Sequence, residues 1–499
     1  MSNNNILKLA TVFSGIGAIE HALERMEIPY KIVFACDNGD VDILSKKIQE
    51  NILEIEKELS ELSEKIDLIE IQEDEDILYT DELNLILART KEEIAIYKRM
   101  DINNSAENKM KRKLKDICQR TGMLHEKINS FKILKELSKL NSYKEKKEYV
   151  DLLYKGKEES NKVKKTYMSN YKLENENFHW NVSFLDGSQY ENEVDLFVGG
   201  SPCQSFSLVG KQRGLADTRG TLFYEYARLV KEIRPKVFIY ENVKALLSND
   251  EGRTWETISK IFTDLDYTWK KAVLNAKDYG IPQNRERVFI VGFRKDLNLN
   301  KEFEFPKPIP LEKKMQDFLI DNAPGGYFLP EKGVDFVTDE KNLHKRYTQI
   351  DGEIQLCQKK NQQFNWHGDF VFQSEEDAKN KIKKDLEKYF LSEKVRKYVL
   401  SSGTKNFYSK PKTDLEVARP LLTTMHKMHR AGVDNYVTTD GRLRKLTPRE
   451  CFRLMGFSDN FKIPVSDTSA YQQAGNSIVV DVLIHIMESI FDCYPMLGK

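Results

Sequence analysis

Apolar residues are grouped along much of the chain in short runs that alternate with amphipathic, helix-like stretches. The runs that predict buried strands are residues 6–13, 30–35, 194–198, 237–240 and 287–293. The stretches that predict helices between them are residues 18–26, 221–232 and 254–265. Short apolar strands alternating with helices are typical of βαβ units. We therefore expect an α/β fold with a mostly parallel sheet covered by helices on both faces.

A different pattern fills residues 41–175, where apolar residues recur every three or four positions in Glu/Lys-rich sequence. Three such heptad seams predict three helices, with breaks near residues 72–79 and 103–105, folded as a coiled-coil hairpin or small bundle. We expect a solvated insertion with a structural role or a role in docking a protein partner. A basic arm that contacts DNA is the alternative, supported by the basic residues at 109–115 and 162–165.

The last third of the chain divides into two parts. Residues 296–440 are irregular and rich in Lys, Asn, Pro and aromatic residues, with one helix expected near 376–400. Residues 445–490 are helical and apolar again, and we expect them to pack back on the first domain.

Composition narrows the classes of protein that the chain can belong to. Its 499 residues include 78 basic and 78 acidic side chains, so any nucleic-acid surface must be a local patch. The six cysteines are far apart, which argues against a zinc site or a disulfide framework and favours the reducing cytosol. Neither a signal peptide nor a run of about 18 apolar residues is visible, so we expect no membrane association.

The first candidate site is the turn between the first strand and the first helix. Phe13, Gly15, Ile16 and Gly17 form a small-residue turn that lets a ligand approach the backbone, although structural glycines explain such turns equally well. Asp37 ends the next strand, where a carboxylate can accept hydrogen bonds from a ribose diol. The phosphate-binding glycine pattern is incomplete, which favours a phosphate-free nucleoside such as S-adenosylmethionine.

The second candidate site follows the later strands. Cys203 comes after a strand and a tight turn, at the edge of the sheet where ligands bind, although a lone cysteine is ordinarily structural. Glu241 follows the next strand. Arg285 and Arg287 alternate with their neighbours and so face one side of a third strand. Each of these residues has an ordinary explanation when taken alone.

Taken together and in this order, the motifs closely resemble those of the cytosine-C5 DNA methyltransferases of bacterial restriction–modification systems. The matching runs are residues 13–18, 200–214, 219–223, 241–243, 279–287, 444–459 and 473–480. The resemblance implies a Rossmann-like, S-adenosylmethionine-dependent catalytic domain made of residues 1–40 and 176–295. It also implies a target-recognition domain at 296–440 and a segment at 441–499 that packs back on the catalytic domain.

The resemblance implies a role for each catalytic candidate. The thiolate of Cys203 would add to C6 of cytosine and so make C5 nucleophilic. Glu241 would stabilise the adduct at N3, Arg287 would hold O2, and Arg285 would order the thiolate and Glu241. The base must leave the duplex for this chemistry, with the 204–214 loop closing behind it.

Cofactor and DNA contacts are implied as well. Asn181 stands where relatives have a carboxylate that contacts adenine, and Asp186 is the competing candidate. The expected cofactor residues are Phe13, Gly15, Ile16, Gly17, Asp37, Asn181, Val182, Pro202, Leu222, Asn476 and Ser477. The expected contacts with double-stranded DNA are Gln204, Ser207, Arg213, Arg419, Thr423, Lys427 and Arg430. Residues 405–450, with about ten basic and about five acidic side chains, form the expected basic patch.

Three other functions remain open from the sequence. An RNA cytosine-C5 methyltransferase shares the fold, but the large 296–440 region favours reading of DNA sequence. A silent DNA-binding regulator would not need the intact Cys203, Glu241 and Arg287. A scaffold built on the coiled coil would not need the ordered motifs. We expect a bacterial cytoplasmic, nucleoid-associated monomer that needs no metal.

Overall fold

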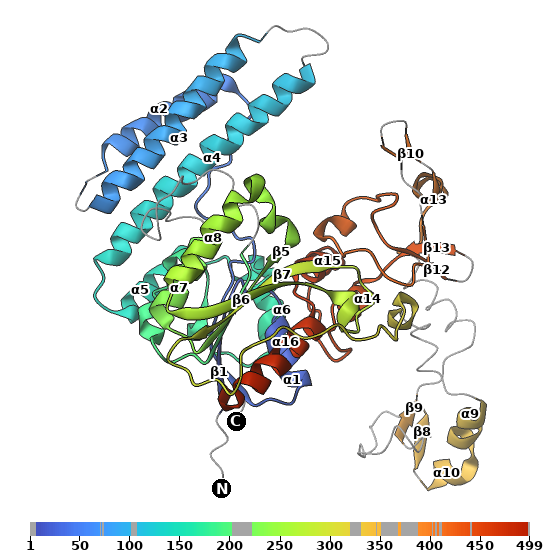
Figure 1. The fold of residues 1–499 in the computed structure, drawn as a ribbon. Coiled ribbons are helices and arrows are strands. Elements are labelled where there is room, and N and C mark those ends of the chain that lie inside the picture. The colour runs from blue at the N-terminus through green and yellow to red at the C-terminus, as the bar shows by residue number, and fades with distance from the viewer. Residues whose placement is uncertain are drawn as a thin grey trace.

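A seven-stranded sheet forms the centre of the protein in the computed structural model (Figure 1). Its strand order is β3-β2-β1-β4-β5-β7-β6. The strands are β1 (Leu7–Val12), β2 (Tyr30–Cys36), β3 (Phe178–His179), β4 (Leu196–Gly199), β5 (Val237–Val243), β6 (Tyr267–Asn275) and β7 (Glu286–Arg294). The first five are parallel, and β7 runs antiparallel to both β5 and β6. The parallel-dominated sheet confirms the expected fold class, whereas β6 was missed because its sequence alternates exposed and half-buried positions.

The structure describes most of the chain. The described residues are 6–69, 71, 74–100, 107–201, 222–319, 331–345, 347–350, 368–370, 388–401, 403–404, 407–408, 412–439 and 442–497.

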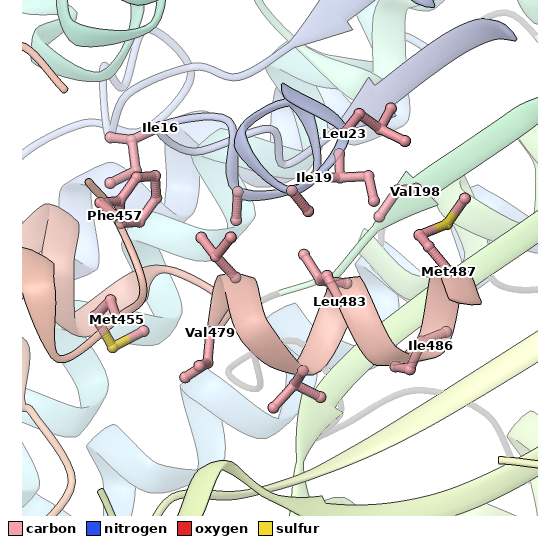
Figure 2. Close-up of a cluster of buried hydrophobic side chains, with 14 of the residues drawn as sticks. Ile16, Ile19, Leu23, Val198, Met455, Phe457, Val479, Leu483, Ile486 and Met487 are labelled. Carbon is pink, nitrogen blue, oxygen red and sulfur yellow. The ribbon is translucent and has the colours of Figure 1, made fainter. Parts of the chain in front are cut away.

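Helices cover both faces of the sheet, and successive strand residues supply the two hydrophobic cores. In β5, Ile239 packs in the core with α1 (Ala18–Arg25) and α16 (Val480–Cys493), whereas its neighbours along the strand point to the opposite face. That opposite core holds α7 (Leu222–Ile233) and α8 (Arg253–Asp264). Figure 2 shows Ile19 and Leu23 of α1 facing Leu483 and Met487 of α16.

The heptad region forms three long helices that project from the body, here named the arm: α2 (Ile52–Asp67), α3 (Asp74–Lys98) and α4 (Glu107–Ser138). Their apolar seams meet in a core of their own. The members of this core that are at most 1% exposed are Ile55, Leu59, Leu62, Ile66, Leu83, Ile117, Leu124 and Ile128. The arm therefore has an internal hydrophobic core, separate from the two cores around the sheet.

Two further helices follow the arm and pack on the body: α5 (Tyr143–Leu153) and α6 (Lys162–Asn170). On α6, Tyr167 lies in the core of the catalytic sheet and is fully buried. Lys164 lies over the rings of Phe178 and Trp180, at 4.9 and 5.2 Å from their centroids. The predicted insertion 41–175 thus contains α6, which belongs by its contacts to the main body, because its apolar face is needed to cover the sheet.

The region after the sheet contains short elements. They are α9 (Glu331–Thr338), α10 (Glu340–His344), β8 (Thr348–Ile350), β9 (Gly368–Phe370), α13 (Glu393–Leu400), β10 (Gly403–Thr404), β11 (Phe407–Tyr408), β12 (Tyr436–Thr439) and β13 (Arg442–Lys445). The helix expected near 376–400 begins only at Glu393, where the Ser392 side chain caps it. Residues 388–392 are not helical, since Phe390 bridges to Arg444 of β13. Residues 371–387 lie outside the described residues.

The chain returns to the body through α14 (Pro448–Arg453), α15 (Asp467–Asn476) and α16. By length and composition the stretch Asp467–Cys493 is the one candidate membrane span within the described ranges, but 56% of its apolar 18-residue window is buried inside the protein, as in a core helix. The guanidinium of Arg25 on α1 donates to both carboxylate oxygens of Asp481 on α16, at 2.8 and 2.9 Å. The C-terminal segment therefore packs on the first helix of the chain.

Candidate active site

Glu241 and Arg287 form an ion pair at the end of β5. The Nε of Arg287 lies 3.2 Å from Oε1 of Glu241, and the two side chains are 20% and 14% exposed. Sheet register explains the contact, because Glu241 is opposite Phe289 in the antiparallel β5–β7 pair and Arg287 is two positions away on the same face. The pair provides one guanidinium and one carboxylate, side by side, at the carboxyl edge of the parallel strands.

Burial sets the protonation of this carboxyl group. Desolvation raises the pKa of Glu241 above its ordinary value, while the charges of Arg287 and Arg285 act in the opposite direction. Gly200, just after β4, allows the close packing, since a Cβ there would lie 2.8 Å from the backbone oxygen of Glu241 and 3.0 Å from its Oε2. A carboxyl with a raised pKa can hold a proton and donate it to a ring nitrogen.

A polar network fixes the chain where it leaves β4 towards Cys203. The Asn242 side-chain amide donates to the Ser201 carbonyl and to the Tyr240 hydroxyl, both at 2.9 Å. The Ser201 hydroxyl lies 2.6 Å from the same Tyr240 hydroxyl. Cys203 itself lies outside the described residues, as do Pro202, Gln204, Ser207 and Arg213. The structure nevertheless brings Ser201, two residues before Cys203, beside the strand that carries Glu241.

Arg285 has a different environment from Arg287, although the sequence placed them together. Its guanidinium donates to three backbone carbonyls: Leu421 at 3.2 Å and Gly475 and Ser477 at 2.9 Å each. Burial and the nearby Arg287 lower the pKa of Arg285. Its Nε is buried without a hydrogen-bond partner among the described residues. These contacts make Arg285 a positioning residue that joins the 421 loop to the turn after α15.

The small-residue turn and the end of β2 are joined by a hydrogen bond. The Gly15 amide donates to the Asp37 carboxylate at 2.9 Å, and burial raises the pKa of Asp37. Phe13 has a φ of 52°, a left-handed conformation that bulky residues adopt rarely and that marks a functional turn. Among the described residues, a Cβ added to Gly15 would meet only the Phe13 carbonyl, at 3.9 Å, so these residues leave this side of the turn open. An open turn beside a carboxylate fits a nucleoside.

Some predicted cofactor residues point elsewhere. The side chain of Ile16 is 2% exposed and packs in the core, where Figure 2 shows it beside Phe457. The side chain of Val182 is buried in the opposite core, and its carbonyl accepts from Arg228 at 2.9 Å. The half-buried side chain of Leu222 packs against that same core. Ile16 and Val182 therefore stay predictions for the cofactor site through their backbones, because apolar packing occupies their side chains.

The remaining cofactor candidates lie at the ends of elements. Asn181 caps the short 3-10 helix Val182–Phe184, and its amide donates to the Tyr154 hydroxyl at 3.3 Å. The competing Asp186 forms an ion pair with Lys146 at 2.6 Å. Asn476 is exposed at the end of α15. The Ser477 hydroxyl donates to the Ile478 carbonyl at 3.0 Å. Gly17 begins α1.

Sequence reasoning missed the residues around α6 that hold this turn. The Tyr171 hydroxyl donates to the Gly17 carbonyl at 2.7 Å, and the Asn161 amide donates to the Asp37 carbonyl at 3.0 Å. The Tyr167 hydroxyl donates to the buried Glu20 carboxylate of α1 at 2.5 Å. The sequence did contain one signal for this helix. Two tyrosines, Tyr167 and Tyr171, are spaced four residues apart in an otherwise polar stretch.

Comparison with known proteins decides the family. The model of the C-5 cytosine-specific DNA methylases matches residues 148–492, more than half of the chain. The chain belongs to the C-5 cytosine-specific DNA methylase family. The matched range begins after the arm, so it excludes β1, α1 and β2, which the arm separates from the rest of the methylase.

Curated relatives agree with this family. The chain is 35% identical over 303 residues to the Type II methyltransferase M.HhaI of Haemophilus parahaemolyticus, covering 59% of this chain and 75% of that protein. It is 34% identical over 331 residues to the Type II methyltransferase M1.ScrFI of Lactococcus lactis subsp. cremoris, covering 66% and 69%. The solved S. pombe Dnmt2 methyltransferase has a TM-score of 0.49 at 14% identity, covering 98% of this chain and 99% of that one. The expected function, a DNA cytosine-5-methyltransferase, is confirmed by the family and by the two Type II methyltransferases.

The DNA-facing candidates of the methylase fall into two groups. The Arg419 guanidinium donates to the carbonyls of Lys412 and Asp434 at 3.3 and 3.1 Å, so it supports the backbone of its own loop. Arg430 donates to the Thr424 hydroxyl at 2.6 Å and pairs with Asp434. Lys427, in contrast, is exposed. Arg419, Lys427 and Arg430 all stay predictions as DNA contacts, and Lys427 is the one of the three whose side chain is exposed.

Thr423 lies where the candidate recognition loop meets the catalytic body of the methylase. A Cβ on Gly475 of α15 would lie 2.6 Å from the Thr423 amide, so the two segments are in close contact. The side chain of Gln283 accepts from the Leu421 amide at 3.0 Å and donates to the Leu454 carbonyl at 2.8 Å. Within the described part of the chain, no group of three His, Cys, Asp or Glu could hold a metal ion.

Proposed function

We propose that the methylase transfers a methyl group from S-adenosylmethionine to C5 of a cytosine flipped out of a specific duplex DNA sequence, through a covalent bond between Cys203 and C6. The observation that supports this most is the half-buried Glu241–Arg287 pair beside the strand that leads to Cys203. A carboxyl with a raised pKa next to a guanidinium matches the N3 and O2 edge of cytosine.

The chain's own groups account for the steps on the base. The Cys203 thiolate forms a bond to C6, and the electron pair of the C5–C6 double bond moves to C5, where it becomes nucleophilic. Glu241 supplies a proton or hydrogen bond at N3, and Arg287 donates to O2, so that charge developing on the ring is stabilised. When bound, S-adenosylmethionine supplies an electrophilic methyl group. A base then removes the C5 proton, the double bond reforms, and the thiolate of Cys203 leaves.

The residues that would hold the cofactor are those of the open turn. Phe13, Gly15 and Gly17 offer backbone and ring surface, and Asp37 would bind the ribose diol. Asn181, Pro202, Leu222, Asn476 and Ser477 stay predictions for the rest of the cofactor site. For Ile16 and Val182 only the backbone remains available, because their side chains are buried in the cores.

The wider role follows from the relatives, which are Type II methyltransferases. We propose a restriction–modification role for a bacterial cytoplasmic protein that acts as a monomer on DNA. Residues 296–440 would read the sequence, with Thr423, Lys427 and Arg430, together with Gln204, Ser207 and Arg213, on the DNA side. Docking of a protein partner on the arm stays a prediction of the sequence.

Replacing Cys203 by serine tests the mechanism. Cys203→Ser should lower the methylation rate of duplex DNA at least about a thousandfold, because the nucleophile is lost. Its matched control is Cys118→Ser, a half-buried cysteine of the arm, which should methylate at the wild-type rate. Wild-type protein should also form a covalent complex on DNA that contains 5-fluorocytosine. A Cys203→Ser protein that methylates normally would contradict the proposal.

A further inference from the structure

The three helices of the arm differ strongly in charge. In α4, nine Lys and Arg residues face four Asp and Glu residues, whereas α2 has two basic and six acidic residues and α3 has three basic and seven acidic. Solubility alone does not require the basic residues of a helical bundle to lie on one helix. Part of the asymmetry is explained by pairing within the arm, and part is not.

The paired part is the half of α4 near the body. Three basic side chains of α4 pair with acidic side chains of α3. Arg120 lies 2.7 Å from Glu93, Lys127 lies 2.8 Å from Glu82, and Lys135 lies 2.7 Å from Asp76. The charges of these three pairs neutralise one another across the α3–α4 contact.

The far end of α4 has a different arrangement. Lys109, Arg112 and Lys115 are exposed and Lys113 is half-buried, and among the described residues none of the four has an acidic partner within 4 Å. The acidic helix α2 begins only beside Cys118, whose thiol contacts the Gln49 carbonyl, so this end of α4 extends beyond α2. We name these four residues the arm tip. Lys109, Arg112 and Lys113 follow the three- and four-residue spacing that puts side chains on one helix face.

The arm starts and ends at the DNA-facing edge of the sheet. It leaves after Asp37, at the carboxyl end of β2, and the chain returns to form β3 beside the same strand. Glu241 and Arg287 lie at this edge. In Figure 1, α4 is the helix of the arm nearest the sheet, α2 and α3 lie on its outer side, and the far end of α4 points towards the side of β10 and β13. In this view the basic helix lies between the acidic helices and the sheet.

We propose that the arm tip binds the phosphate backbone of duplex DNA outside the recognised sequence, which rests on the function proposed above and adds a second DNA surface to it. Exposed Lys and Arg side chains without acidic partners attract DNA phosphates, and their binding releases counterions from the DNA. The acidic helices α2 and α3 disfavour binding of DNA on the opposite side of the arm. The 32 residues of α4 span about 48 Å, the length of about 14 base pairs, so the contact lies in flanking DNA.

The test compares duplex length in the full-length protein. The tip variant carries Lys109→Gln, Arg112→Gln, Lys113→Gln and Lys115→Gln. Its matched control carries Lys57→Gln, Lys65→Gln, Arg89→Gln and Lys91→Gln, which remove the same charge from α2 and α3. The Kd is measured across a salt series on a duplex with about 30 flanking base pairs on each side and on one with about five.

The tip variant should bind the long duplex about tenfold more weakly, with a salt slope smaller by about two to four, and should bind and methylate the short duplex as wild type does. Replacing the three tip lysines by arginine should preserve long-duplex binding. Unchanged long-duplex affinity, an equal loss on the short duplex, or an equal loss in the control variant would each overturn the proposal. If the wild-type protein did not methylate the short duplex, that result would instead count against the proposed function.

Discussion

At the scale of single residues, the site depends on small distances between neighbouring strands. Gly200, just after β4, lies close to the backbone and the carboxylate of Glu241, and this carboxylate pairs with Arg287 of β7. Asn242 and Tyr240 hold the Ser201 carbonyl and hydroxyl on the same side. Because a misplacement of 1 Å can cost about a hundredfold in rate, each of these contacts has a catalytic consequence without touching the base.

Substitution of Gly200 by alanine should test that dependence. The added Cβ would meet the Glu241 backbone oxygen at 2.8 Å and Oε2 at 3.0 Å, so the carboxylate must move. The backbone of β5 must shift as well, so we expect kcat/KM to fall about a hundredfold and Tm to fall with it. Gly122→Ala is the matched control, since its Cβ would meet only the Lys46 carbonyl at an ordinary 3.7 Å. Equal activities of the two variants would contradict this prediction.

At the scale of elements, α6 joins parts of the chain that lie far apart. Tyr171 and Tyr167 reach Gly17 and Glu20 on the first helix. Gln473 on α15 donates to the Lys162 carbonyl at 2.9 Å. This one short helix therefore contacts both ends of the chain at the turn proposed for the cofactor.

The Glu20–Tyr167 contact predicts a pH dependence of stability. Burial raises the pKa of Glu20 to about 7, against the opposing hydrogen bond from Tyr167. The folded protein then holds a proton that the unfolded chain releases near pH 4.5, so stability falls as the pH rises from about 4.5 to 7 and levels off above. A shift of this size corresponds to at most about 3 kcal/mol.

We expect Glu20→Gln to flatten the dependence of Tm on pH between 5 and 8 and to raise Tm above pH 7, because the amide oxygen still accepts from Tyr167 and cannot ionise. The measurement is thermal unfolding at a series of pH values. Glu27→Gln, on an exposed side chain just after the same helix, should keep the wild-type slope. A Glu20→Gln protein with that same slope would show that Glu20 does not titrate in this range.

Elements with a clear hydrophobic period were predictable from the sequence. The helices expected at 221–232 and 254–265 are Leu222–Ile233 and Arg253–Asp264, and the run 30–35 is Tyr30–Cys36. The same polar sequence continues from the arm into α6, so the four-residue spacing of Tyr167 and Tyr171 was the one signal that distinguished the two, and the contacts of α6 depend on tertiary packing. The continuous helix expected at 376–400 is wrong at residues 388–392, since local propensity does not report the bridge at Phe390, and residues 376–387 lie outside the described residues.

The site was predictable to the extent that it follows strand ends. Glu241 and Arg287 meet as the alternation of β7 indicated. The roles of Arg285 and Ile16 were not visible, because they depend on segments about 136 to 441 residues away: Leu421 for Arg285 and Phe457 for Ile16. Sequence alone shows which residues reach the edge of the sheet, and packing decides which of them stay free for a ligand.

At the scale of the whole molecule, two attachments hold the parts together. Arg444 on β13 and Glu450 on α14 form a buried bidentate pair at 2.9 and 2.8 Å, which fixes the β12–β13 hairpin to the C-terminal segment. The arm is joined at a narrow root, where the Asn129 side chain donates to the Leu44 carbonyl at 2.8 Å. Val41 and Leu137 pack in a small core beside this root.

The narrow root predicts that the arm can be removed. Replacing residues 46–128 by a short glycine linker should leave the fold intact and keep the methylation rate on a short duplex within about threefold, since the two ends are already neighbours and closing a short loop costs little. A longer deletion that also takes residues 129–138 should lower Tm, because it removes Leu137 from the root core. Equal unfolding of both deletions would show that the whole arm is part of the body.

The insertion also has a consequence in time. The Tyr171 hydroxyl that holds Gly17 is synthesised 154 residues after it, which at about 5–20 residues per second is a delay of about 8–30 s on the ribosome. The three helices of the arm make their contacts with one another, so they can fold during that delay, while β1, α1 and β2 have neither α6 nor β4 to pack against. β1, α1 and β2 are therefore synthesised well before α6 and β4, and until these follow, their apolar faces can pack only against one another.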